Sequence, residues 1–271
     1  MFLSAEQRAA LEAVYGFCRV VDDIVDERPE GIEGARLARG QLDAWRTHLD
    51  HLFDGAETEL DTPLTEPLQT AIETYHLRKA PMLEIIDGCA MDLEQAQYAT
   101  MEDLERYCYR VASCVGLLCI PIFGDDSEPA RAYARHLGLA LQYTNILRDV
   151  GEDAARGRVY LPTSLLSSHG LGHEDILAGT YDPRFIGAAA QFASLAEREY
   201  ASAWTQFSHV EAPLRLVPAE VMGRTYYEIL NEIRGFNFDV FVRRASLRRR
   251  VKLRVAAMTI ARNAAYQHGL H

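Results

Sequence analysis

Carboxylates at a helical spacing occur in two distant stretches of the sequence. The first stretch, YGFCRVVDDIVDE from Tyr15 to Glu27, places Tyr15, Arg19, Asp22 and Asp26 at steps of four, three and four residues. At about 3.6 residues per turn, these side chains form one stripe along a helix that is otherwise mostly apolar. Two carboxylates one turn apart repel each other by roughly 0.2–0.5 kcal/mol. The stripe therefore indicates either a solvated acidic face or a site where a cation is expected between the acids.

The second stretch, LQYTNILRDVGEDAARGRVYLP from Leu141 to Pro162, repeats this spacing. Its polar side chains follow at steps of three, four, four and three residues: Gln142, Asn145, Asp149, Asp153 and Arg156. Two such helices facing each other would line a cavity with four carboxylates and an amide. Mg²⁺ prefers hard oxygen ligands of this kind and usually keeps several waters, with substrate phosphates completing its coordination. Mn²⁺ is the alternative ion.

Basic residues interleave with both sets of acids. They are Arg19, Arg148, Arg156 and Arg158. A guanidinium binds phosphate oxygens through a fork of N–H donors. Acids alone would predict a metal site, whereas acids together with arginines predict a site for Mg²⁺ and a diphosphate.

The elements that must position these motifs are all predicted to be helices. We expect helices over residues 4–27, 33–53, 67–77, 81–94, 102–123, 183–209, 213–234 and 248–267, and a long one from the turn at 124–129 to about 156. Residues 157–181 are predicted to be irregular because glycine, serine, histidine and proline cluster there. No stretch indicates a strand and no repeat of fixed period is present. The sequence predicts one all-α domain over residues 1–271, a helical bundle around a deep central cavity.

Composition and cysteine usage narrow the class of protein. The chain has 271 residues, 48% of them hydrophobic, and a formal net charge of −11, which argues against a nucleic-acid partner. The five cysteines show no CxxC spacing and lie in apolar helical contexts, so we expect reduced thiols in the core of a cytoplasmic protein. We expect no signal peptide, and no membrane span, since no apolar run approaches about 18–20 residues.

The charge is unevenly distributed. Between Arg234 and Arg254 there are eight basic residues and one acid. A basic patch on an acidic protein attracts an anionic substrate or an anionic membrane surface, and a solvated basic helix end is the alternative. Within this segment, Arg243 and Arg244 are candidates for binding a substrate diphosphate, and Arg248, Arg249 and Arg250 for peripheral membrane contact.

Small residues gather in the middle of two predicted helices. They are Gly88, Cys89 and Ala90 in one helix and Ala112, Ser113 and Gly116 in the next. Glycine costs roughly 1 kcal/mol in a helix relative to alanine. The pattern indicates either close packing of another element or room left for a hydrocarbon chain.

The motifs together resemble a known family, the squalene and phytoene synthases, which join two prenyl diphosphates through their C1 ends. The resemblance rests on YxFCRxxDDIxD, on QxTNILRDVGEDxxRGRxYLP, and on YCYRVASCVGLLCIPIFG from Tyr107 to Gly124, and it runs from about Phe2 to the end of the chain. The second motif is long and specific. The resemblance implies a helical fold whose members hold prenyl chains in a tunnel lined by helices.

The resemblance also implies roles for individual residues. Metal and diphosphate binding would fall to Asp22, Asp26, Asn145, Asp149 and Asp153. Diphosphate-binding or catalytic partners would be Arg19, Arg148, Arg158, Tyr107 and Tyr160. Tyr226 is a further candidate, because an aromatic ring can stabilise passing positive charge or its hydroxyl can shuttle a proton. Tyr15, Gln142 and Arg156 are assigned to substrate binding.

The expected reaction is a Mg²⁺-dependent condensation through a cyclopropylcarbinyl diphosphate. The second motif looks most like that of phytoene synthases, which use two geranylgeranyl diphosphates and no reductant. The alternatives are squalene-type, presqualene diphosphate or dehydrosqualene synthases, which use two farnesyl diphosphates, with NADPH needed only for squalene. Chain elongation, terpene cyclisation and a non-catalytic assembly role are further alternatives.

One feature of the family is not found in the sequence. Members usually carry a Ser-x-Ser-Phe-like segment ahead of the first motif, which contributes to the diphosphate pocket, whereas this sequence opens with MFLSAEQR. We expect either an earlier start of the chain or a pocket completed by other residues.

Overall fold

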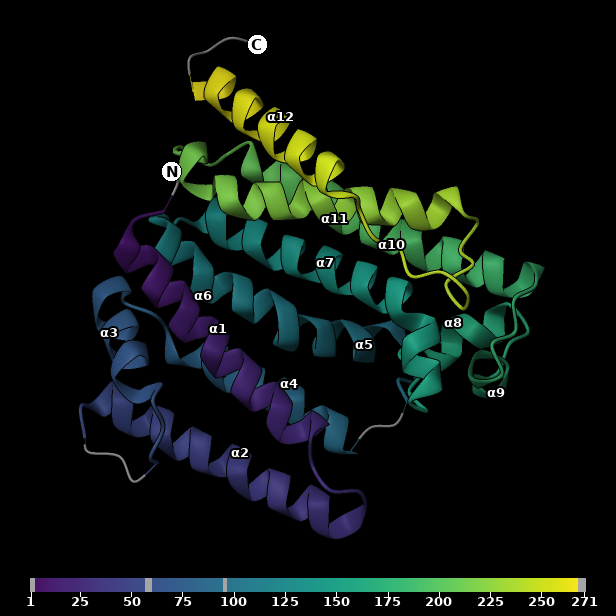
Figure 1. Ribbon diagram of the computed structural model, residues 1–271, viewed down its shortest axis with the longest axis horizontal. Coiled ribbons are helices and arrows are strands. Elements are labelled where there is room, and N and C mark those ends of the chain that lie inside the picture. Colours follow the sequence, from purple (N-terminus) through teal and green to yellow (C-terminus); the bar gives the residue numbers. More distant parts are fainter. Residues whose placement is uncertain (1–2, 57–59, 95–96, 268–271) are drawn as a thin grey trace.

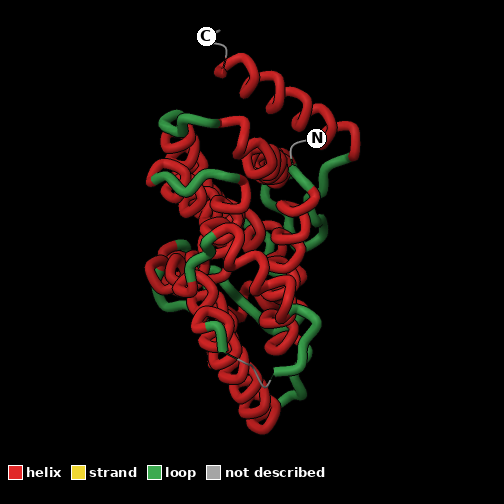
Figure 2. The backbone as a smooth tube through the Cα atoms, turned by 90° about the vertical axis from the view of Figure 1, so that its left-hand side faces the viewer, coloured by secondary structure: helices red, strands yellow, loops and turns green. Residues whose placement is uncertain are grey.

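Helices account for nearly all the regular structure of the computed structural model, which describes residues 3–56, 60–94 and 97–267 (Figures 1 and 2). The α-helices are α1 Ala5–Asp26, α2 Gly31–Asp54, α3 Thr65–Tyr75, α4 Lys79–Glu94, α5 Met101–Cys108, α6 Cys114–Phe123, α7 Glu128–Ala155, α8 Thr163–Ser168, α9 His173–Leu177, α10 Pro183–Phe207, α11 Val217–Gly235 and α12 Arg249–Gln267. A π-helical turn, η1 Tyr109–Ser113, joins α5 to α6, and a 3₁₀ turn, η2 Pro213–Leu216, precedes α11. The described residues contain no strand beyond one isolated bridge between Gln97 and Val159.

The first acidic stretch forms the C-terminal half of α1. The helix begins with a capping box in which the Ser4 side chain and Gln7 satisfy each other's backbone N–H groups. Its apolar face, including Phe17 and Val21, is buried against α2, α3, α4 and α6. This burial leaves the polar stripe of Tyr15, Arg19, Asp22 and Asp26 exposed.

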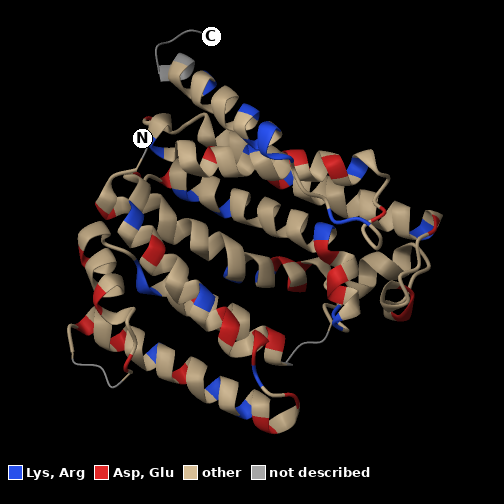
Figure 3. Ribbon diagram, in the orientation of Figure 1, with Lys and Arg blue, Asp and Glu red and all other residues tan. Residues whose placement is uncertain are grey.

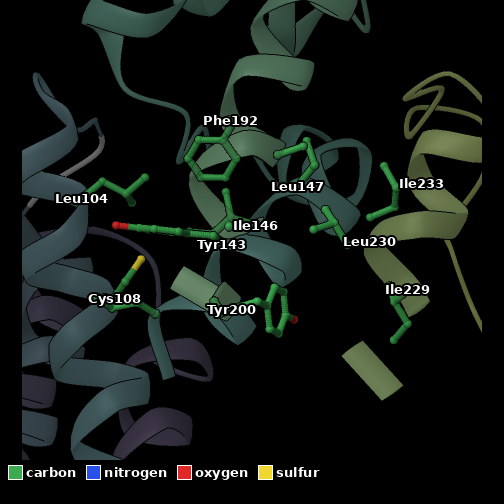
Figure 4. Close-up of a cluster of buried hydrophobic side chains, with 14 of the residues drawn as sticks. Leu104, Cys108, Tyr143, Ile146, Leu147, Phe192, Tyr200, Ile229, Leu230 and Ile233 are labelled. Atoms are coloured by element: carbon green, nitrogen blue, oxygen red, sulfur yellow. The ribbon is translucent and has the colours of Figure 1, made fainter. Parts of the chain in front are cut away.

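The second acidic stretch belongs to α7, which has the largest interface of the fold with α10. Ser127 caps its N-terminus. Tyr143 on α7 meets Phe192 on α10 with ring centroids 5.4 Å apart, and Ile146 and Leu147 pack beside them toward Leu230 on α11 (Figure 4). The apolar side of α7 is therefore locked into the core, as the sequence pattern predicted.

The run α5–η1–α6 lies between these two layers. By length and composition, it is the one helical run of the described residues that is apolar enough to cross a membrane, but it packs against α1, α4 and α7 inside the fold. A Cβ on Gly138 would lie 2.5 Å from the Cα of Ser113, and one on Gly88 would lie 2.8 Å from the Cβ of Arg110. Glycine is required at both positions because the helices approach each other so closely.

α1 and α7 point their C-terminal ends to the same side of the molecule (Figure 1). Near the start of α1, Gln7 Nε2 donates to the carbonyl oxygen of Ile122 at 2.8 Å, at the end of α6. At the other end, Arg158, just after α7, pairs with Asp26 at 3.0 Å. Neither helix carries a basic residue in its last turn. Both acidic motifs are thus at the same end of the bundle.

The chain after α11 crosses α7 before it forms α12. We call residues 236–248 the strap. α12 then packs on α11 and η2 at the edge of the fold. The predicted helices are confirmed in order and approximate position, with two corrections. Residues 157–181 contain the short helices α8 and α9, and the predicted helix over 102–123 contains a π-helical turn.

Candidate functional site

An apolar cavity of about 440 Å³ lies between α6, α7 and α11, with one residue of α1 at its edge. Most of its lining is hydrocarbon, and its residues are Tyr15, Val111, Ala112, Val115, Gly116, Cys119, Ile120, Phe123, Tyr133, Ala134, Leu137, Gly138, Leu141, Gln142, Asn145, Ala219, Met222 and Tyr226. Gly116 and Ala112 both line this space, and a Cβ on Gly116 would already lie 3.1 Å from the carbonyl oxygen of Ala134. Small residues here serve both close packing and an open cavity.

The polar end of the cavity adjoins the acidic motifs. Gln142 and Asn145 enter it from α7, and Tyr226 enters it from α11. The side-chain oxygen of Asn145 is buried, and no described residue hydrogen-bonds to it. A buried oxygen without a donor is energetically costly, so this atom is available to bind a ligand at the polar end of the cavity.

The first acidic pair faces basic residues from elsewhere in the chain. Arg158 donates to Asp26 at 3.0 Å. Burial, and then the neighbouring charge of Asp26, raises the pKa of Asp22, against the influence of Arg19. Arg19 itself pairs mainly with Asp23, at 2.8 Å, and lies 3.7 Å from Asp22. A raised pKa means that the surroundings of the carboxyl disfavour its charged form.

The two carboxyls of the second acidic pair have different surroundings: among the described residues, Asp149 is paired with arginines, and Asp153 is not. Asp149 accepts from Arg148 Nε at 2.8 Å and from Arg244 Nε at 2.9 Å. Burial favours the neutral carboxyl, but these two hydrogen bonds outweigh it and hold the pKa of Asp149 below its usual value. Burial raises the pKa of Asp153 to about 6, with Asp149 adding to the rise and Arg158 opposing it.

These features test whether the residues suit Mg²⁺. Within the described ranges, no three His, Cys, Asp or Glu side chains converge closely enough to hold an ion by themselves. The donors come instead as two carboxylate pairs with the unpartnered oxygen of Asn145, and desolvation disfavours the charged forms of Asp22 and Asp153, which a bound cation would favour. Mg²⁺ usually binds through one or two carboxylates, waters and substrate phosphates, so the donor set suits it. The assignment of these oxygens to a metal stays a prediction.

An aromatic cluster with a buried acid adjoins the first pair. The Tyr107 hydroxyl donates to Asp92 at 3.0 Å. The Tyr160 ring stacks on Tyr107 at 5.6 Å and on Tyr98 at 6.1 Å between centroids. Burial raises the pKa of Asp92 to about 6, although the hydrogen bond from Tyr107 and the charge of Arg158 lower it. Backbone contacts hold this arrangement, since Thr163 N donates to Tyr98 O at 2.9 Å.

Sequence reasoning missed Asp92. A signal was present, because this carboxylate follows directly on the run of small and flexible residues from Gly88 to Met91. The charge of Arg158 lowers the pKa of Asp92, and the charges of Asp26 and Asp22 raise it. The aromatic cluster therefore lies at the same end of the bundle as the motif acids.

The remaining candidates are distributed unevenly. Arg148 lies over the Tyr226 ring at 6.0 Å, which connects the second motif to the cavity. Tyr15 lines the edge of the cavity but is 70% exposed. Arg156 is exposed and influences Asp153 only through its charge. Arg243 is exposed too, and in the described part of the chain its side chain makes no ion pair, whereas Arg244 reaches Asp149.

The free thiols are buried or half-buried. Cys89, Cys108 and Cys114 are buried, and Cys18 and Cys119 are half-buried; all five are free. Burial raises the pKa of each thiol, and therefore keeps it protonated and weakly nucleophilic. The thiols are packing residues here.

Asp92 should make the stability of the metal-free protein depend on pH. The carboxyl ionises near pH 4 in the unfolded chain and at about 6 in the fold. Between these values the folded state binds more protons, so the free energy of unfolding falls as pH rises from about 4 to about 6. We expect Asp92→Asn in EDTA to flatten this slope and to gain roughly 2 kcal/mol at pH 7.

Urea unfolding at pH 4.5 and pH 7 measures this effect. Exposed Asp54→Asn is the matched control and should leave the slope unchanged. Equal pH slopes in the wild type and Asp92→Asn would show that Asp92 is not held partly protonated.

Comparison with known proteins agrees with this geometry. The sequence model of the squalene/phytoene synthase family matches residues 1–255. A 15-cis-phytoene synthase from Synechococcus elongatus is 37% identical over 264 residues, which are 90% of this chain and 81% of that protein. A presqualene diphosphate synthase from Zymomonas mobilis is 38% identical over 233 residues, covering 85% of this chain and 77% of that protein.

A solved structure supports the same relationship. The crystal structure of a dehydrosqualene synthase in complex with a ligand superposes with a TM-score of 0.83 at 26% identity, over 97% of this chain and 89% of the other. The family match spans both acidic motifs, the aromatic cluster and the cavity helices. The chain belongs to the squalene/phytoene synthase family.

Proposed function

We propose that this protein catalyses the Mg²⁺-dependent head-to-head condensation of two prenyl diphosphates, and that its product is phytoene, formed from two geranylgeranyl diphosphates. One observation carries the proposal. A cavity lined almost entirely by hydrocarbon adjoins, at Asn145, a set of carboxylates and guanidinium groups. A prenyl diphosphate has the same division, with a long apolar chain attached to a strongly anionic head.

The basic residues of the site are suited to holding the diphosphate. Arg158 lies beside the first acidic pair, and Arg148 and Arg244 lie beside the second. Bound Mg²⁺ would neutralise charge on the diphosphate as it leaves. The arginines take the remaining phosphate oxygens and hold the head group at the polar end of the cavity. The prenyl chain then lies along α7 and α6, where water is excluded.

The reaction needs two departures of diphosphate and two losses of a proton. When diphosphate leaves the first substrate, its C1 becomes an allylic cation. The allylic double bond of the second substrate attacks C1, and loss of a proton closes a cyclopropylcarbinyl diphosphate. Departure of the second diphosphate allows rearrangement to the C1–C1 bond, and a second proton loss gives phytoene without a reductant.

Two groups near the polar end suit this chemistry. Tyr226 lines the cavity beneath Arg148, where its ring can stabilise passing positive charge. Asp92 and Tyr107 form a hydrogen-bonded pair, and the pKa of Asp92 near 6 suits it to accept a proton through the phenol. Catalysis otherwise depends on positioning and electrostatics, since no covalent enzyme intermediate is required.

The product distinguishes this proposal from its relatives. We expect purified protein with Mg²⁺ to convert geranylgeranyl diphosphate to phytoene, with no change in yield on adding NADPH. Farnesyl diphosphate, tested in parallel with and without NADPH, should be used more slowly. Mass analysis of the extracted hydrocarbon decides the outcome.

Specific results would redirect the assignment. A faster reaction with farnesyl diphosphate would indicate a presqualene diphosphate or dehydrosqualene product, and squalene formed only with NADPH would indicate a squalene synthase. Diphosphate release that yields only longer linear or cyclised prenyl products would exclude head-to-head chemistry.

The four motif acids provide the second test. We expect Asp22→Asn, Asp26→Asn, Asp149→Asn and Asp153→Asn each to lower turnover by at least about 10–100-fold, since even residues that only support metal ligands have effects of this size. Each should also reduce the stabilisation that Mg²⁺ with inorganic pyrophosphate gives in a thermal melt. Without metal, Asp22→Asn and Asp153→Asn should melt at or above the wild-type temperature, because the pKa of each carboxyl is raised by burial in the fold.

A matched control lies on the same helix as the first pair. Glu12 is exposed on α1, about three turns before Asp22, and Glu12→Gln should leave both measurements unchanged. Full turnover in Asp149→Asn, or loss of the fold in every variant, would exclude a metal role for these residues.

We further propose that the N-terminal end of α12 contacts anionic membrane. Arg248, Arg249 and Arg250 are exposed, as are Leu253 and Met258, which are 61% and 66% accessible. Each basic residue near an anionic surface contributes about 1 kcal/mol. Replacing the three arginines with glutamine should weaken binding to phosphatidylserine vesicles in a salt-dependent way, and leave kinetics in detergent unchanged.

Three exposed arginines elsewhere in the chain provide the control for this prediction. Arg36→Gln, Arg78→Gln and Arg106→Gln, combined, remove the same charge elsewhere and should affect vesicle binding much less. Equal binding by the wild type and the α12 variant in vesicle sedimentation would contradict a membrane role for this helix.

A further inference from the structure

Gly151 lies where the strap crosses α7, in the middle of the second acidic motif. A Cβ on this residue would lie 2.7 Å from the carbonyl oxygen of Val240 and 3.0 Å from the Cα of Phe241. Both neighbours are backbone atoms. A change of rotamer therefore cannot relieve the contact, and any side chain at position 151 must move the strap or α7.

The strap is held on its other side, so it has little freedom to move away. Phe241 packs on Phe185 of α10, with ring centroids 4.8 Å apart. The Tyr181 hydroxyl donates to the carbonyl oxygen of Asn237 at 3.0 Å. Asn237 and Phe238 both have positive φ angles, 56° and 63°, which form the turn into the strap. The strap is thus clamped between α10 and Gly151 of α7, which has no side chain to hold it away.

This clamp sets the position of Arg244. Three residues after Phe241, its Nε lies 2.9 Å from Asp149 Oδ1 and 3.0 Å from Glu152 Oε1. The two acids flank Gly151 in the sequence, so the point of closest approach and the ion pairs share one turn of α7. A displacement of the strap at Val240 would carry the Arg244 guanidinium away from the motif.

We propose that Gly151 is a positioning residue for diphosphate binding, because its missing side chain lets the strap cross α7 and place Arg244 beside the second acidic motif. This inference rests on the proposed function, which makes that motif the diphosphate end of the site. By this proposal, the chain beyond α11 contributes Arg244 to the binding pocket, and Gly151 acts on the pocket without touching the substrate.

The test compares two glycine-to-alanine substitutions in helices. Gly40 lies in α2 with nothing within 4 Å of a Cβ, so Gly40→Ala should raise the melting temperature by about 2–4 °C from helix propensity alone. Gly151→Ala should lower it. Hydrogen exchange of residues 236–246 should quicken in Gly151→Ala only.

Ligand binding provides the functional readout. Without prenyl substrate, the affinity for inorganic pyrophosphate with Mg²⁺ should fall about tenfold in Gly151→Ala, the size expected for one charge-assisted hydrogen bond. KM for the prenyl diphosphate should rise by a similar factor, with a smaller change in kcat. Arg244→Gln should reproduce the loss of affinity without faster exchange in the strap.

A second route loosens the strap without altering α7. Phe241→Ala removes the contact with Phe185 and should give the same pair of effects, faster exchange and weaker pyrophosphate binding. Val242 is 81% exposed on the same strap, and Val242→Ala should change neither. If Gly151→Ala does not fold, Phe241→Ala decides the question.

The outcomes separate this inference from the proposed function. Wild-type pyrophosphate affinity in Gly151→Ala, or in Phe241→Ala with a loosened strap, overturns the role of Gly151 whatever the reaction product is. A wild type that binds pyrophosphate but forms no head-to-head product contradicts the proposed function, while the strap comparison still stands.

Discussion

Like charge at the ends of two helices is the constraint on which this structure depends. α1 and α7 finish on the same side of the fold, each with two motif acids near its end and no basic residue in its last turn. A helix C-terminus adds the equivalent of about half a negative charge to the carboxylates already there. The helices cannot supply the compensating cations from their own last turns, so other segments must bring them. Arg158 comes from the loop after α7 and Arg244 from the strap.

That requirement explains why irregular segments gather at this end. The loop after α7 pairs with residues 97–99, and this pairing places Tyr160 against the tyrosines of the aromatic cluster and Arg158 against Asp26. The strap packs against Gly151 of α7 and brings Arg244 to Asp149. Even with these cations, desolvation keeps the pKa values of Asp22, Asp92 and Asp153 raised, although Asp22 is exposed and the other two are only partly buried. A divalent cation bound among these carboxylates would favour their charged forms.

Local periodicity allowed part of the site to be predicted from sequence. The stripes on α1 and α7 depend only on the pitch of a helix, and the apolar residues around them fix which face is buried, so the sequence was enough to assign the motif acids, Asn145 and Gln142 to helical stripes. The ion pair of Arg19 with Asp23 was not predicted, because both aspartates of the DD pair are within its reach. The pairing of Asp92 with Tyr107 and the contact of Gly151 with the strap could not be predicted, since both depend on which distant segments meet. The π-helical turn in the central helix likewise gave no periodic signal.

One face of α7 joins the two halves of the site. The cavity lining on this helix extends from Tyr133 to Asn145, and twelve residues of helix span about 18 Å. The motif acids follow within the next two turns, so a ligand whose head is held at Asp149 and Asp153 has its chain directed along the same rigid helix. The other face of α7 is buried against α10 and α11 (Figure 4), and Figure 3 shows the acidic residues concentrated at its far end. Because the core fixes α7, the distance between the charged head and the end of the cavity is set by helix geometry rather than by a flexible loop. Tyr133 of α7 and Phe123 of α6 line the cavity away from the acids, so side chains there would limit the length of the prenyl chain that this site accepts.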